Sequence, residues 1–174
     1  MTRSIYRRPW RIDLDRRDGV TSPLSDAALA RAVAAALDEV RAPSPASIGL
    51  ILADDDELAA LNEAHMGKRG PTDVLSFPLL PPAAFAPGTG RAEVAEDPRP
   101  PGSRLHLGDI VVSVERAVEQ AAEGRGGQTG DVRWSAADEL RLLVTHGTLH
   151  ICGWDHAEPA DEAAMRSLER RLLG

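Results

Sequence analysis

Three of the five histidines in this chain lie within eleven residues, at the spacing H-x3-H-x5-H. His146 and His150 are four residues apart, so in a helix their side chains lie on one face, about 40° apart around the axis. Gly153 follows, and because glycine readily adopts positive φ and ends helices, the chain can turn back there and deliver His156 from outside the helix. The spacing therefore predicts three imidazoles that converge on one metal ion.

Three protein ligands leave one position of a tetrahedral ion open to water. Structural zinc sites are usually closed by four protein ligands, whereas three ligands plus water is the catalytic pattern, with the pKa of the bound water lowered to about 7. We therefore expect a single, reactive Zn²⁺ ion. Cys152 would lie about 200° around the helix from His150, so we expect it in the core and not as a fourth ligand. The alternative is three unrelated histidines.

Metzincin peptidases share this spacing, in the form H-E-x-x-H-x-x-G-x-x-H, with the glutamate as general base. The corresponding residue here is Gly147, which can neither accept a proton from the zinc-bound water nor orient that water. Gly147 instead predicts a place where another backbone packs closely against the helix. The residues therefore favour a zinc site without peptidase chemistry.

Three sequence blocks together resemble one known family. They are PTDVLSFP at 71–78, LGDIVVS at 107–113 and HGTLHICGWDH at 146–156. In this order they resemble the YbeY family of bacterial metal-dependent endoribonucleases, over most of residues 45–172. The resemblance implies zinc bound by His146, His150 and His156, and cleavage of single-stranded RNA in maturation of the 16S rRNA 3′ end and in ribosome quality control. The implied partners are ribosomal RNA and the small ribosomal subunit, without DNA.

The chain departs from the family pattern L-N-x-x-Y-R that precedes the PTDVLSFP block. Counting back from Pro71 places Met66 at the position of the family's arginine, which is regarded as important for activity. Methionine carries no charge and cannot bind a phosphate. Lys68 and Arg69 are close by and are our candidates for a catalytic cation supplied from a shifted position, the alternative being two solvated loop residues.

The sequence does not single out one proton acceptor. Asp109 in the LGDIVVS block and Asp155 next to a predicted ligand are the candidates. Either carboxylate could instead hold a histidine in one tautomer through a hydrogen bond. This orienting role is favoured for Asp155 over proton transfer, because Asp155 directly precedes His156.

Composition predicts one domain over residues 1–174 in the cytoplasm. The chain has no apolar run near 18 residues, its first residues lack the apolar segment of a signal peptide, and a single cysteine suits a reducing compartment. The net charge is −7, although residues 1–17 hold six arginines against two aspartates. Because an acidic body binds nucleic acid poorly, RNA would need a local basic patch from these arginines, Lys68 and Arg69. The alternative is that the arginines lie in a solvated segment or an edge strand.

The order of predicted elements indicates an α+β fold, a single domain with a mixed β-sheet packed with several helices, and the zinc site on a helix and the loop after it. The three aspartates at 54–56 could form a second metal site. The acidic first turn of a helix is favoured, because carboxylates there complement the helix dipole. The proline- and glycine-rich segment 81–102 predicts a long flexible loop, and 124–130 a flexible turn. We expect strands at 46–53, 71–77 and 105–113, and helices at 24–41, 54–62, 114–123, from 135 to the histidines, and up to 173.

Three functions remain open at this stage. The first is hydrolysis of RNA phosphodiesters at the zinc ion, for which the missing glutamate matters less than for peptide cleavage, because phosphate chemistry depends on positioning and charge neutralisation. The second is a ribosome-assembly or RNA-binding factor with a mainly structural zinc, which Met66 favours. The third is a zinc peptidase, which Gly147 disfavours.

Overall fold

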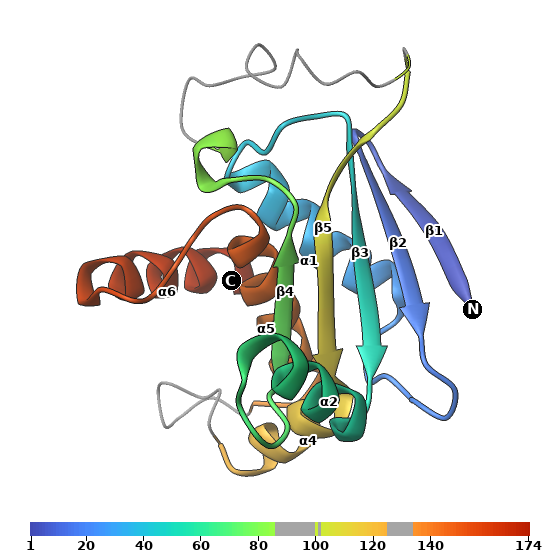
Figure 1. The fold of residues 1–174 in the computed structure, drawn as a ribbon, viewed down its shortest axis with the longest axis vertical. Coiled ribbons are helices and arrows are strands. Elements are labelled where there is room, and N and C mark those ends of the chain that lie inside the picture. The colour runs from blue at the N-terminus through green and yellow to red at the C-terminus, as the bar shows by residue number, and fades with distance from the viewer. Residues whose placement is uncertain (86–99, 101, 125–133) are drawn as a thin grey trace.

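The five strands form one mixed sheet in the order β1-β2-β3-β5-β4 (Figure 1). The computed structural model describes residues 1–85, 100, 102–124 and 134–174. Parallel pairs join β2 to β3 and β3 to β5, and antiparallel pairs join β1 to β2 and β4 to β5. The strands are β1 (Thr2–Arg7), β2 (Trp10–Arg16), β3 (Ala46–Ala53), β4 (Val74–Pro78) and β5 (Leu105–Ser113).

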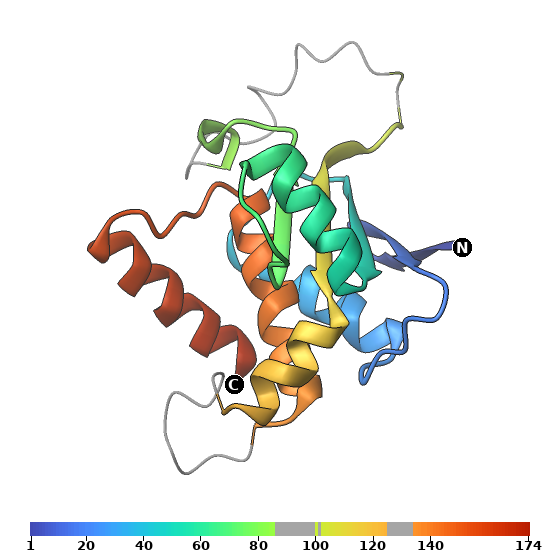
Figure 2. The same ribbon diagram turned by 60° about the horizontal axis from the view of Figure 1, so that its bottom comes forward.

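Helices cover both faces of this sheet. Helices α1 and α5 pack on one face, α2 lies over β4 and β5 on the other, and α6 packs beside α5 (Figures 1 and 2). The helices are α1 (Asp26–Glu39), α2 (Asp55–Met66), the 3₁₀ turn η1 (Pro82–Phe85), α4 (Val114–Ala122), α5 (Ala136–Ile151) and α6 (Pro159–Leu173). The predicted α+β domain with a mixed sheet is confirmed. No helix in the described ranges is long and apolar enough to span a membrane.

Side-chain caps start the helices where the sequence predicts them. The Ser25 hydroxyl accepts a hydrogen bond from Ala28 N, and Asp54 accepts one from Glu57 N at 2.9 Å. Ser135 and Asp138 form a reciprocal capping box at the start of α5. The aspartate run at 54–56 is therefore a helix start, as favoured, and α2 continues past the predicted end to Gly67, which adopts φ +63° as its cap.

The main core lies between the sheet and helices α1 and α5. Strand residues Ile12, Ile48, Leu50 and Ile110 are fully buried against Leu29 and Val33 of α1 and Leu140 and Val144 of α5. A smaller cluster joins Leu149 of α5 to Met165 and Leu168 of α6. Burying side chains of this size stabilises the fold by about 1.5–3 kcal/mol each. Helix α5 is therefore held on both sides, by the sheet and by α6.

Four of the six amino-terminal arginines lie on strands, Arg3 and Arg7 on the edge strand β1 and Arg11 and Arg16 on β2, while Arg8 lies in the turn between them and Arg17 follows β2. In β2, Trp10, Ile12 and Leu14 alternate into the core, while β1 is an edge strand. Most of the predicted loop 81–102 and the turn 124–130 lies outside the described residues, which leaves both predictions open. At the start of the loop, residues 82–85 form the 3₁₀ turn η1.

Gly147 is a close-approach point, but side chains and not backbone approach it. A Cβ atom built there would lie 2.7 Å from Cγ2 of Ile110, 3.1 Å from Cγ2 of Val74 and 3.3 Å from Oγ of Ser76. The prediction of a packed backbone was wrong, because the pleat of β4 and β5 points these side chains at α5. The absence of a side chain at 147 lets the histidine-bearing helix lie directly on the sheet.

We predict that Gly147→Ala destabilises the metal-free protein by about 1–2 kcal/mol, because overpacking costs more than the gain of about 1 kcal/mol in helix propensity. Ile110→Ala opens space for the new methyl group, so Gly147→Ala should cost less in that background. Urea unfolding of the wild type, both single variants and the double variant measures this coupling. Simple additivity would contradict the contact.

Candidate metal centre

The imidazoles of His146, His150 and His156 converge on one point. Their ligand atoms all lie within 4.8 Å of one another, and the Nε2 atoms of His146 and His150 are 2.9 Å apart. His156 stacks on His146, with ring centroids 5.5 Å apart. The predicted three-histidine group is confirmed, and among the described residues it is the one group of three or more histidine, cysteine or acidic residues arranged to hold a metal.

A turn at Gly153 brings His156 back to the helical pair. Gly153 has φ +84°, and the backbone N–H of Trp154 donates to the carbonyl of Leu149 at 3.0 Å, which closes the end of α5. A Cβ at Gly153 would lie 2.8 Å from Cα of Pro82. Glycine is therefore required twice, for the backbone conformation and for the packing of η1 against the turn.

The donor set fits a divalent transition metal. Two nitrogens that bind one tetrahedral ion at about 2.0–2.1 Å lie about 3.3 Å apart, close to the observed separation of His146 and His150. Burial, and secondarily the neighbouring imidazoles, lower the pKa of His150 to about 4. The imidazole of His150 is therefore neutral at pH 7, the form that binds metals. Together with the imidazoles of His146 and His156 at the same point, it forms a metal-binding site.

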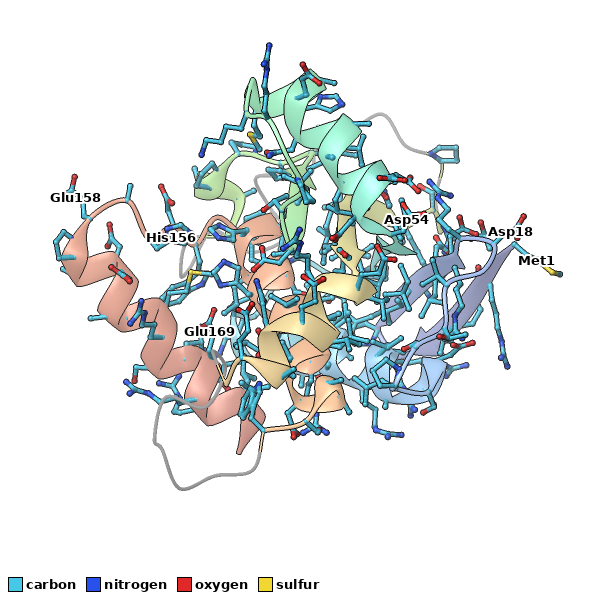
Figure 3. The ribbon with its side chains drawn as sticks, turned by 90° about the horizontal axis from the view of Figure 1, so that it is seen from below. Met1, Asp18, Asp54, His156, Glu158 and Glu169 are labelled. Carbon is cyan, nitrogen blue, oxygen red and sulfur yellow. The ribbon has the colours of Figure 1, made fainter. Side chains whose placement is uncertain are left out.

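Glu169 on α6 orients His146, and sequence reasoning missed it. Its carboxylate lies 2.5 Å from Nδ1 of His146, and only 7% of the residue is exposed. Figure 3 shows His156 on the loop before α6 and Glu169 on the inner side of that helix. The contact keeps the proton on Nδ1 and leaves Nε2 to face the other histidines. No local spacing signals it, because 23 residues separate the two side chains.

The histidines open onto a pocket of about 360 Å³ beside β4. This volume is within the range of small-ligand pockets. The residues that line the pocket are Met66, Thr72, Asp73, Val74, Leu75, Ser76, Pro78, His146, His150 and His156. Asp73 is the one carboxylate and no lysine or arginine is present in this described lining. The ionisable groups that face a bound molecule are thus three imidazoles and one carboxylate.

Cys152 and Asp155 lie close to the histidines in sequence but are not metal ligands. Cys152 is 3% exposed, and burial raises the pKa of its thiol to about 12, so it remains protonated in the core as predicted. Asp155 accepts a hydrogen bond from the backbone N–H of His156 at 2.7 Å. It therefore stabilises the turn that carries the third histidine, and within the described residues it forms no hydrogen bond with an imidazole.

The three candidate catalytic residues lie outside the pocket. Lys68 and Arg69 follow α2 with exposed side chains, and neither is among the lining residues, whereas Met66 is. On β5, Ile110 points at α5, so Asp109 points to the opposite face of the sheet. There its carboxylate lies 3.2 Å from Nε2 of His106. The position of Asp109 gives no support to a direct role beside the three histidines.

Ion pairs neutralise much of the amino-terminal positive charge. Arg3 and Arg16 pair with Asp26, Arg11 pairs with Asp13 at 3.0 Å, and Arg17 pairs with Glu57 at 2.7 Å. Guanidinium groups engaged in this way are less available to phosphates. The predicted basic patch is therefore weaker than the composition of residues 1–17 indicates.

The fold and site together define a class: α+β proteins that hold a metal on three histidines from a helix and the turn after it. The family model described as "Endoribonuclease YbeY" matches residues 14–174. The chain belongs to this family, as its sequence blocks predicted.

Relatives of this chain carry the same family name. A protein named Endoribonuclease YbeY from Salinispora tropica is 42% identical over 139 residues, which cover 79% of each chain. A protein of the same name from Thermobifida fusca is 38% identical over 162 residues, covering 93% of this chain and 91% of the relative. The solution structure of TM1509 from Thermotoga maritima has a TM-score of 0.51 at 22% identity, covering 93% of this chain and 86% of TM1509. This last likeness shows a shared fold.

We predict that Glu169→Gln weakens metal binding by about ten- to a hundredfold, because the amide no longer stabilises the proton on Nδ1 of His146. Competition titration with a chromophoric chelator measures the affinity. Glu162→Gln is the matched control, since Glu162 lies on α6 but pairs with Arg166, and it should retain wild-type affinity. Equal affinities for both variants would contradict the orienting role.

Proposed function

We propose that this chain is a metal-dependent endoribonuclease that hydrolyses phosphodiester bonds of single-stranded RNA. The observation that carries the proposal is the convergence of His146, His150 and His156 on a pocket, in a chain that belongs to the endoribonuclease YbeY family. Three ligands without a fourth protein donor is the catalytic pattern.

The residues of the site have different roles in the proposed hydrolysis. When bound, the ion supplies a Lewis acid for a phosphate oxygen and lowers the pKa of a bound water. The three histidines hold it, and Glu169 fixes the orientation of His146. Asp73, not Asp109, is our candidate for the proton acceptor, because it is the carboxylate that lines the described pocket. Gly147 supplies no general base, and this continues to disfavour peptide hydrolysis.

The finer features of the proposal come from the family. We propose one Zn²⁺ as the ion, ribosomal RNA and the small ribosomal subunit as partners, and maturation of the 16S rRNA 3′ end and ribosome quality control in the cytoplasm as the process. Residues 1–174 would act as one domain. Lys68 and Arg69 lie in the loop after Met66, and we propose that they contact the RNA beyond the pocket, where exposed cations attract phosphates.

A cleavage assay with and without chelation tests the proposed function. Zinc-loaded protein should cut single-stranded ribosomal RNA, lose this activity after chelation and regain it when zinc returns. His150→Ala removes one of three ligands, so it should lose most of the bound metal, measured by elemental analysis, together with the activity. RNA binding without any cleavage by the loaded protein would favour the alternative, an assembly factor with a structural metal, which the absence of a cation at Met66 supports.

We predict that Met66→Arg raises kcat/KM for RNA cleavage by about tenfold. Met66 is 50% exposed and lines the pocket, where the described lining offers no cationic side chain to the phosphate. A guanidinium at this place would stabilise the charge on the phosphate oxygens in the transition state. Met66→Gln is the control of similar length without charge. If the arginine variant does not exceed the glutamine variant, the pocket neutralises the phosphate by other means.

A further inference from the structure

The outer edge of β4, which pairs with no other described strand, borders the pocket of the three histidines. Strand β4 is the last in the sheet, and its antiparallel partner β5 occupies one edge. Ser113 N donates to the carbonyl of Asp73, and Leu79 N donates to the carbonyl of Leu107. Because residues of an antiparallel pair point alternately toward and away from the partner, Leu75 and Phe77 also face β5. The main-chain groups of Val74, Ser76 and Pro78 therefore face outward, and all three residues line the pocket.

This outward edge offers one hydrogen-bond donor. The N–H of Val74 already donates to the Asp73 carboxylate at 2.8 Å, and Pro78 has no N–H. The N–H of Ser76 remains, together with the carbonyl of the same residue. Neither of these two groups forms a hydrogen bond with another described residue. The edge thus presents a single adjacent donor and acceptor, flanked by the carbonyls of Val74 and Pro78.

Ser76 is tied directly to the helix that carries the histidines. Its hydroxyl donates to the carbonyl of Gly147 at 2.9 Å. Gly147 directly follows His146 in α5. The packing of α5 on the sheet at Gly147 fixes this arrangement. A molecule bound by the main chain of Ser76 therefore lies beside the three imidazoles.

We propose that the N–H and C=O of Ser76 pair with the Watson–Crick edge of one unpaired nucleotide next to the scissile phosphate. Each RNA base carries an adjacent donor and acceptor on that edge: uracil N3–H with O4, adenine N6–H with N1, guanine N1–H with O6, and cytosine N4–H with N3. The main chain of one residue in a strand offers the complementary pair. The site accepts any base, provided that the base is not already paired.

An extended peptide is a poorer match for the same edge. A peptide strand that adds to a sheet edge alternates donors and acceptors along several residues. Here Val74 and Pro78 offer no free donor on either side of Ser76, so each of these two residues could form only one of the two hydrogen bonds of a regular strand pair, through its carbonyl. Proline at an outward position is also a common way to block strand addition. A single planar base needs one donor and one acceptor.

The inference rests on the proposed function and gives it a physical basis for single-strand selection. A nucleotide in a duplex uses its Watson–Crick edge for its partner base and cannot bind Ser76. Phosphate contacts alone would not make this distinction, since duplex and single strand both carry them. In this acidic protein, main-chain pairing also lessens the need for a basic groove.

Modified RNA tests the pairing with the wild-type, zinc-loaded protein. The substrates are single-stranded oligouridylates with one 3-methyluridine or one 5-methyluridine at successive positions around a mapped cut. The 3-methyl group removes the N3–H donor, whereas the 5-methyl group leaves the Watson–Crick edge intact. We expect one position at which 3-methyluridine lowers cleavage at least tenfold and 5-methyluridine changes it less than twofold. Equal tolerance of both at every position overturns the inference.

Two substitutions at Ser76 test the pairing from the side of the protein. Ser76→Ala removes the hydroxyl and keeps the N–H, whereas Ser76→Pro removes both, at an outward position like that of Pro78. We expect Ser76→Pro to cleave unmodified RNA about tenfold more slowly than Ser76→Ala and to lose the discrimination between the two methyluridines. Discrimination retained by Ser76→Pro with normal zinc content overturns the inference.

The outcomes separate this inference from the proposed function. If wild-type protein cuts no unmodified RNA, the endoribonuclease proposal fails. Suppose the wild-type protein cuts RNA but cleaves 3-methyluridine and 5-methyluridine substrates equally, and Ser76→Pro cleaves as fast as Ser76→Ala. In that case the base-pairing inference fails and the endoribonuclease proposal stands. Binding of an extended peptide that competes with RNA and is lost in Ser76→Pro would overturn the choice of occupant in favour of strand addition.

Discussion

The structure depends on holding three imidazoles within ligand distance of one another. Helix α5 supplies two of them and is fixed by the sheet on one side and by α6 on the other. The missing side chain at Gly147 allows this helix to lie on β4 and β5, and Glu169 of α6 fixes the ring of His146. Because His146 and His150 lie on a packed helix, the positions of these two ligands are set before metal binding, which reduces its ordering cost.

The electrostatics of the site distinguish it from a simple basic cleft. The protein is acidic, its amino-terminal arginines are largely paired with carboxylates, and the described pocket lining includes Met66 but no lysine or arginine. A phosphodiester would therefore find positive charge mainly at the metal position. The N–H and C=O of Ser76, which bond to no other described residue, are the other binding feature that we assign to the pocket, and such a pair suits an unpaired base better than a phosphate.

Much of the fold could be predicted because local signals agreed with the final structure. The strand at 46–53, the caps at Ser25 and Ser135, and the end of α5 at Gly153 all depend on neighbouring residues. Strand β2 was not predicted separately, although Trp10, Ile12 and Leu14 alternate, because the six arginines of residues 1–17 were interpreted as a solvated segment or an edge strand. The close contact at Gly147 was predicted with the wrong partner, since nothing local identifies what approaches a helix.

The sequence alone determined the three metal ligands and the family, because residue spacing along a helix and the position of one glycine fix how those imidazoles meet. Only the tertiary structure decided the rest of the site. It brought Glu169 to His146, placed Met66 and Asp73 in the pocket, turned Asp109 to the opposite face, and left the outer edge of β4 without a partner among the described strands. These contacts join residues far apart in the chain, and their partners are set by packing and by the order of strands in the sheet.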